Sequence, residues 1–139
     1  MTTRSSLDGH EDSLAGFYSE SGDLAVEGTA VGLRRLADAL RLGRAEVVLD
    51  IEPGKGPSPY DGFLERIVIA LGSERVAVSR AGRALCIVGN SDALAQMAAN
   101  IDALSNERGG HLHEEYYPGH FYLAAESAPV VVELLPQAP

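Results

Sequence analysis

The feature that most constrains the fold of this chain is a pattern that occurs twice. A strand-like run with alternating apolar residues, Leu24-x-Val26-x-Gly28-Thr29, returns as Leu85-x-Ile87-x-Gly89-Asn90. The helical stripe that follows also returns, as Leu33, Leu36, Ala37 and Leu40 in the first copy and Leu94, Met97, Ala98 and Ile101 in the second. Every match keeps the offset that separates Leu24 from Leu85, without a gap. Agreement in strand, glycine, cap and helix face predicts an internal duplication of a strand-helix-strand unit.

Each copy carries the signals of a helix that begins directly after the strand. Thr29 and Asn90 are residue types that favour the N-cap position, and Gly43 suits the C-terminal cap of the first helix. An amphipathic helix must cover an apolar surface with its stripe. We therefore predict the α+β class, with an antiparallel or mixed sheet and two amphipathic helices packed on one face.

Further strands are expected between and after the two helices. Residues 46–52 alternate around three apolar positions, and residues 75–80 and 83–88 form a hairpin signal around Ala81-Gly82. The segment from 60 to 71 fits a short helix or a strand, and its end, Ile67-Val68-Ile69, favours a strand. In the second copy the expected closing strands are Leu112 to Tyr117, Phe121 to Ala124 and Pro129 to Leu134.

The length and composition predict one domain. The chain has 139 residues with 45% hydrophobic content, which supplies one core. Residues 1–22 are rich in Ser, Gly, Asp and Glu and are expected to form a disordered acidic N-terminal tail. Residues 23–135 are expected to form a single α+β domain, with repeat copies at about 23–80 and 81–135.

The charge excludes some functions and favours others. The net charge is -9, and no Lys or Arg follows Arg108, whereas four acids do: Glu114, Glu115, Glu126 and Glu133. Such a surface repels phosphate backbones, so nucleic acid is not an expected partner, while a basic protein would be attracted. A role in solubility alone stays open. No apolar run is long enough to cross a bilayer and no secretory signal precedes the domain, so we expect a cytoplasmic protein.

The residue types that carry chemistry are densest in residues 111–120. In a strand, His111, His113 and Glu115 would point to one face. Together with His120 they could hold a divalent metal, although a His-x-His pair is a weak pattern. The simplest alternative is a polar, solvent-facing strand surface.

The same segment also fits a protein-binding surface. Tyrosines beside carboxylates combine rigid amphipathic anchors with negative charge, a mixture found at interfaces with basic partners. The residues that we expect to contact a partner are His111, His113, Glu114, Glu115, Tyr116, Tyr117 and His120.

No catalytic or cofactor motif stands out in the sequence. There is no nucleophile elbow and no metalloprotease helix. Gly54-Lys55-Gly56 is followed by Pro57, where a phosphate-binding loop needs Ser or Thr. We therefore expect no cofactor and no enzymatic activity.

Two patches resemble the immunity protein 32 family of bacterial polymorphic toxin systems. The first is Leu85-x-Ile87-x-Gly89 with the helix residues Leu94, Ala98 and Ile101. The second is His111-Leu112-His113-x-Glu115-Tyr116-x-Pro118-Gly119, continued by Leu123, Ser127, Pro129 and Glu133. The first half of the chain resembles the family only through the internal repeat.

The resemblance implies a non-enzymatic antitoxin that binds a cognate toxin domain and blocks it. It carries a binding role onto His111, His113, Glu115 and Tyr116. Two alternatives stay open: a small metal- or ligand-binding protein, and a homodimeric domain that pairs through exposed strand edges.

Overall fold

The computed structural model describes residues 12–51, 54 and 56–136. The α+β class is confirmed, because these residues form two helices and two mixed sheets. The elements, in chain order, are β1 (Leu14–Tyr18), β2 (Leu24–Gly28), α1 (Ala30–Leu42), β3 (Ala45–Val48), β4 (Gly62–Leu64), β5 (Arg66–Leu71), β6 (Ala77–Ala81), β7 (Ala84–Gly89), α2 (Ser91–Ser105), β8 (Gly110–Glu114) and β9 (Val130–Leu134). Neither described helix is long and apolar enough to cross a membrane.

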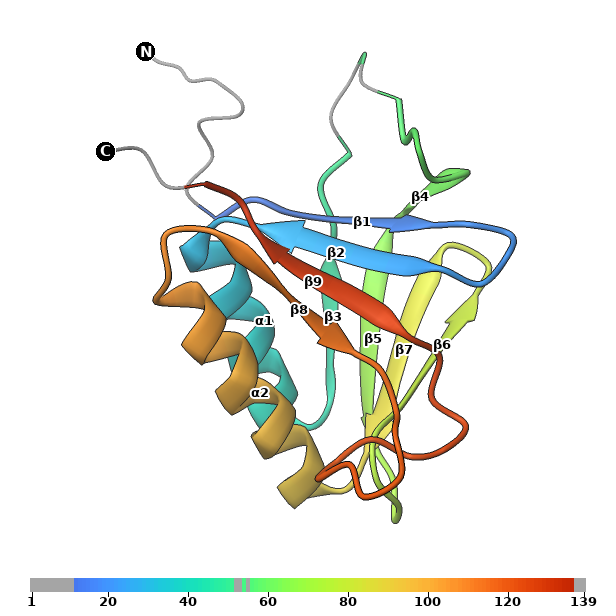
Figure 1. Ribbon diagram of the computed structural model, residues 1–139, viewed down its shortest axis with the longest axis vertical. Coiled ribbons are helices and arrows are strands. Elements are labelled where there is room, and N and C mark those ends of the chain that lie inside the picture. The colour runs from blue at the N-terminus through green and yellow to red at the C-terminus, as the bar shows by residue number, and fades with distance from the viewer. Residues whose placement is uncertain (1–11, 52–53, 55, 137–139) are drawn as a thin grey trace.

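The strands form two sheets, where the sequence predicted one. The five-stranded sheet has the order β4-β1-β2-β9-β8, and the four-stranded sheet has the order β3-β5-β7-β6. In Figure 1 the five-stranded sheet crosses the upper part of the molecule, the helices lie side by side below it, and the four-stranded sheet runs downward. Both sheets are mixed, because β2 pairs with β9 and β5 pairs with β7 in parallel, whereas the other pairs are antiparallel.

The two halves of the chain follow the same path and exchange their last strands. In each half a hairpin, β1–β2 or β6–β7, leads into a helix. After each helix, strands join the sheet of the other half, since β3 and β5 join β7 while β8 and β9 join β2. The exception is β4, which pairs with β1 of its own half. This exchange interlocks the halves around one interior. It is a correspondence of topology, and the internal duplication of sequence stays a prediction.

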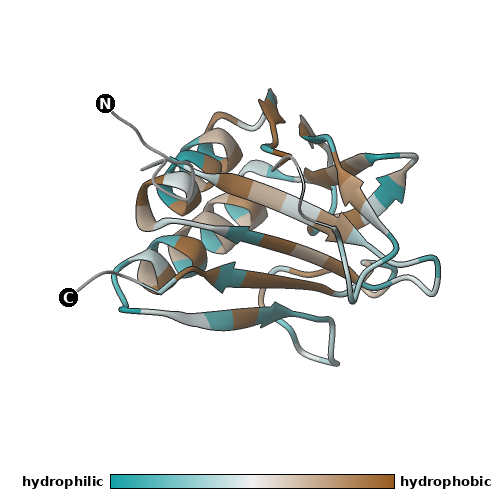
Figure 2. Cartoon of the chain, turned by 90° about the horizontal axis from the view of Figure 1, so that it is seen from above, coloured by the Kyte–Doolittle hydropathy of each residue, from teal (hydrophilic) through white to brown (hydrophobic). Residues whose placement is uncertain are grey.

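The core lies between the two sheets and the two helices. Every residue of the two predicted helix stripes is buried, and so are the inward positions of the strands on both sheets. In Figure 2 the helices and strands alternate between brown and teal segments, as expected for elements with one buried and one exposed side, and most connecting loops are teal or white. The buried residues form one continuous cluster, so burial of apolar surface holds all elements together.

Both predicted N-caps are confirmed. The Gly32 amide donates to Thr29 Oγ1 at 3.0 Å, and the Ala93 amide donates to Asn90 Oδ1 at 2.8 Å. Gly43 ends α1 with a positive φ of 74°, which glycine adopts without steric cost. The strand-to-helix junctions of the two halves are therefore built alike.

The cap of α2 can be tested by substitution. Asn90→Ala removes the side-chain acceptor of the Ala93 amide, and the free energy of unfolding is expected to fall by about 1 kcal/mol. Asn90→Asp keeps an acceptor there and places a negative charge at the helix N-terminus, so it should retain most of the stability. Urea unfolding curves of the three proteins measure the effect. An alanine variant as stable as the parent would contradict the role of this cap.

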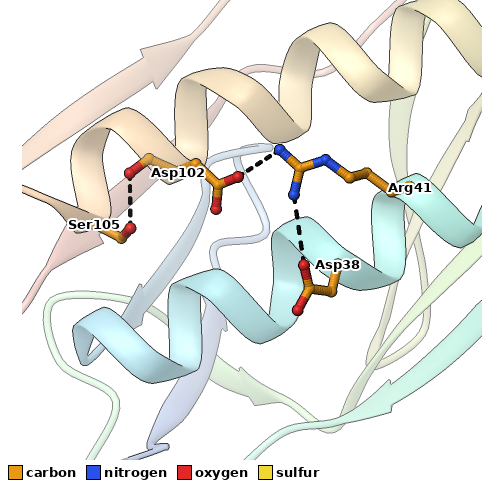
Figure 3. A network of polar contacts seen from close by, with 4 residues as sticks. All are labelled: Asp38, Arg41, Asp102 and Ser105. Atoms are coloured by element: carbon orange, nitrogen blue, oxygen red, sulfur yellow. Dashed lines mark hydrogen bonds and ion pairs between the residues drawn. The ribbon is translucent and has the colours of Figure 1, made fainter.

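The two helices are also joined by charged side chains. Arg41 on α1 lies between Asp38 on its own helix and Asp102 on α2, and it forms ion pairs with both (Figure 3). Ser105 Oγ donates to the Asp102 carbonyl at 2.7 Å. Exposed pairs of this kind contribute at most about 1 kcal/mol, so packing of the apolar stripes dominates the contact between the helices.

Structure begins earlier than the sequence analysis predicted. Strand β1, Leu14–Tyr18, lies inside the segment 1–22 that was assigned to a disordered tail. It pairs with β2 and β4, so it is an inner strand of its sheet. Residues 1–11 lie outside the described part of the chain, and the prediction for them stays a prediction.

Other predicted strands were shifted or replaced. The strand expected at 46–52 spans Ala45–Val48, and the ambiguous segment 60–71 contains the two strands β4 and β5. Phe121 to Ala124 is not a regular strand, because only Leu123 forms an isolated bridge, with Val76. The backbone there still follows the edge of β6, since the Val76 amide donates to the Tyr122 carbonyl and the Ala124 amide donates to the Val76 carbonyl, each at 2.8 Å. This segment covers a sheet edge that would otherwise be open.

Candidate functional site

The histidine segment forms β8, an edge strand of the five-stranded sheet. It pairs with β9 in antiparallel register, with His113 opposite Val131 and His111 opposite Glu133. Since side chains alternate along a strand, His111 and His113 are exposed while Leu112 and Glu114 turn inward. The two imidazole rings meet edge to face, with centroids 4.9 Å apart. The two histidine side chains therefore lie on the same face of the strand, as the sequence predicted.

The outward side chains of the five-stranded sheet form a surface that we call the outer face. Its positions are Ala15 and Phe17 on β1, Ala25 and Glu27 on β2, Phe63 on β4, Val131 and Glu133 on β9, and His111 and His113 on β8. The strand registers align them in rows, of which one runs through Phe63, Phe17, Ala25, Val131 and His113. Both helices lie on the opposite side of this sheet (Figure 1). No described helix covers the outer face.

A hollow of about 270 Å³ opens at one end of the outer face. It is lined by Asp23, Leu24, Tyr60, His113, Glu115, Pro129, Val130 and Val131. The Tyr60 ring stacks on Phe17 with ring centroids 5.6 Å apart, and Phe17 also contacts Phe63 at 5.5 Å. Two carboxylates, an aromatic ring and an imidazole thus line one small hollow.

Glu114 is not on this surface, although the sequence predicted that it contacts a partner. Only 1% of Glu114 is exposed. The Tyr122 hydroxyl donates to its carboxylate and lies 2.6 and 2.7 Å from the two carboxylate oxygens. The Asn100 amide donates to the same hydroxyl at 2.8 Å. Burial raises the pKa of Glu114, and the hydrogen bond from Tyr122 opposes this rise only in part. Burial also raises the pKa of Tyr122, with the neighbouring Glu114 adding to the effect. Glu114 is therefore a structural residue.

His120 is buried as well, with 7% of its surface exposed. Its Nδ1 accepts hydrogen bonds from the backbone amides of Tyr122 at 3.2 Å and Leu123 at 3.1 Å. These bonds hold the start of the segment 121–124, which runs along the edge of β6. Arg75 donates to the His120 carbonyl at 2.7 Å. Burial, and then the positive charge of Arg75, lower the pKa of His120. This histidine orders a loop, and a partner could not reach its Nδ1.

The tyrosines of the segment divide between core and solvent. Tyr116 is half-buried against the core, whereas Tyr117 is 55% exposed and its ring lies 4.8 Å from that of His120. Phe121 nearby is 79% exposed. Of the seven residues predicted to contact a partner, four are exposed in the structure: His111, His113, Glu115 and Tyr117.

The alternative metal site is not assembled in the described part of the chain. Its four candidate ligands were His111, His113, Glu115 and His120. No three His, Cys, Asp or Glu side chains among the described residues are grouped so that they could hold a metal ion. The Nδ1 of His120 is already engaged with two backbone amides.

Sequence reasoning missed the contribution of the first half of the chain to this surface. Phe17, Asp23, Tyr60 and Phe63 were not selected, yet they border or form the outer face beside β8. The alternation in residues 14–18 was a signal for β1, but the surrounding polar residues concealed it. Nothing local to Tyr60 or Phe63 indicates that they pack on Phe17.

Comparison with known proteins gives one match. No curated protein and no solved structure matched the chain. Strands β7, β8 and β9 and helix α2 all lie within residues 85–135 apart from Ala84, the first residue of β7. Residues 85–135 match the model of the family described as immunity protein 32, which confirms over that segment the resemblance indicated by the sequence.

Proposed function

We propose that this protein is an immunity protein that binds a cognate bacterial toxin domain and neutralises it. The observation that carries the proposal is the match of residues 85–135 to the immunity protein 32 family. The matched segment contains β8 and β9, and with them both exposed histidines and Glu133. In this proposal the protein acts by occupying a surface of the toxin inside the producing cell, with no chemistry of its own.

The contact surface in this proposal is the exposed part of the predicted set. His111, His113, Glu115 and Tyr117 reach solvent from one strand and the loop that follows it. Such a mixture of rings and carboxylate suits a partner with basic and aromatic residues. Tyr116 packs on the core and in this proposal supports the segment that follows β8 from its buried side.

The proposal is tested by identifying a toxin domain encoded in a gene neighbouring that of this protein and by using that domain as the partner. We expect the full chain to form a complex with that domain and to protect cells that express it. Replacing His113 and Tyr117 by alanine should weaken the complex, measured by calorimetry, by about tenfold or more. Glu126→Ala, on the exposed loop beside the other sheet, is the matched control and should leave affinity unchanged. Failure of the wild-type chain to bind or to protect would end the proposal.

A further inference from the structure

We infer that the partner docks across the whole outer face of the five-stranded sheet, and that it places an arginine or lysine side chain in the hollow between Asp23 and Glu115. This inference rests on the proposed function for the identity of the partner. It adds the chemistry of the partner surface, which is basic, and it extends the contact to residues of the first half, outside the matched segment 85–135.

The two sheets differ in charge. The strands of the five-stranded sheet contain no Lys or Arg, whereas their acids Glu27 and Glu133 lie on the outer face. The four-stranded sheet is different, because it carries Arg66 and Arg80. Arg66 pairs with Glu46 at 3.4 Å, which neutralises that surface locally. A basic partner is therefore drawn to one sheet of this molecule and not to the other.

The acids of the outer face lie in register across neighbouring strands. Glu27 pairs with Glu133 between β2 and β9, and Glu133 pairs with His111 between β9 and β8. Asp23 precedes β2 and Glu115 follows β8, so both extend the negative surface to the hollow. Carboxylates on β2 and β9, and at the ends of β2 and β8, are therefore distributed over the outer face. Positive charges on the partner would therefore face acids at several positions of the outer face.

The lining of the hollow suits a cationic side chain. A guanidinium or ammonium group can pair with carboxylates and also lie against an aromatic ring. Asp23, Glu115 and Tyr60 supply these groups around one space of about 270 Å³. Val131 and Pro129 add apolar surface that suits the methylene stem of a long cationic side chain, while Leu24 and Val130 turn their side chains into the core. No Lys or Arg lines the hollow, so no cation of the described chain occupies this position.

The decisive variant is Asp23→Lys, because Asp23 is exposed and lies outside the matched segment. In calorimetry with the toxin domain encoded beside this protein, we expect affinity to fall by about tenfold or more at low salt. Glu126→Lys makes the same charge change beside β6 and should alter affinity by less than about twofold. Urea unfolding of both variants verifies that they remain folded. If Asp23→Lys binds as tightly as the parent while the His113 and Tyr117 variant does not, this inference is wrong and the proposed function stands.

A second measurement does not need the toxin. A hexa-arginine peptide is titrated into the isotope-labelled full chain, and backbone amide shifts are followed by NMR, with a hexa-glutamate peptide as the control. Shifts concentrated at Asp23, Tyr60, His113 and Glu115 support the inference, and they should disappear in Asp23→Asn combined with Glu115→Gln. Shifts spread equally over the helix acids Asp38 and Asp92, or no shifts at all, would overturn it even if the toxin binds.

Discussion

Gly32→Ala is expected to lower the free energy of unfolding by about 1–3 kcal/mol, through overpacking against a neighbouring backbone. Helix propensity alone predicts the opposite sign, a gain of about 1 kcal/mol for alanine inside a helix. A Cβ at position 32 would lie 2.0 Å from the Ser13 carbonyl oxygen and 3.1 Å from that of Asp12. Both of these atoms belong to backbone and cannot rotate away. The start of β1 would have to move, although the Ser13 carbonyl also accepts the Thr29 amide at 3.0 Å.

Urea unfolding of the parent and the variant measures this change. Gly56→Ala is the control, because a Cβ there meets no atom within 4 Å and the backbone φ is not positive; its effect should stay within about 0.5 kcal/mol. If Gly32→Ala proves stabilising, the backbone of Asp12 and Ser13 does not pack on α1 as the structure has it.

The helices and their junctions could be predicted because the signals that specify them are local. An N-cap lies three residues before the amide that it accepts, and a helix stripe repeats within one or two turns. Thr29, Asn90 and Gly43 therefore occupy the expected positions. The hairpin at Ala81-Gly82 is equally local, and β6 and β7 pair directly across it.

The division into two sheets could not be predicted, because it depends on pairs far apart in the sequence. The parallel partners of β2 and β7 are β9 and β5, which belong to the other half of the chain. The alternation of a strand specifies which side chains share a face but does not identify the neighbouring strand. Strand β1 was missed for a related reason: five residues between polar segments become an inner strand only when β2 and β4 flank them.

The same distinction applies to the candidate site. Alternation correctly placed His111 and His113 on one exposed face, since that depends on β8 alone. Burial of Glu114 depends on the Tyr122 hydroxyl and the Asn100 amide, which come from a loop and a helix. Alternation alone already places Glu114 on the inward face with Leu112. The hydrogen-bond partners that allow a carboxyl to be buried there are distant in the sequence, and so Glu114 was mistaken for part of an acidic surface.

Glu114→Gln should become progressively more stable than the parent as the pH rises. Burial raises the pKa of Glu114 in the folded protein above the ordinary glutamate value of 4.5. At a pH between the pKa of the unfolded chain and the raised pKa of the folded protein, the unfolded chain has released a proton that the folded chain retains. The parent therefore loses stability as the pH increases, by at most about 1.4 kcal/mol per pH unit for one proton. Glutamine keeps an oxygen that can accept the Tyr122 hydroxyl and has no charge to bury.

The difference in unfolding free energy between variant and parent, from urea titrations between pH 4 and pH 9, isolates this effect. It should rise above pH 4.5 and become level once the folded carboxyl also ionises. The extra amide hydrogens of glutamine add only a constant offset. The lowered pKa of His120 destabilises both proteins as the pH falls below the ordinary histidine value of 6.5, so it cancels in the difference. Glu126→Gln, the same substitution at an exposed position, is the control. A flat difference for Glu114→Gln would mean that this carboxylate is hydrated, contrary to the enclosed arrangement with Tyr122.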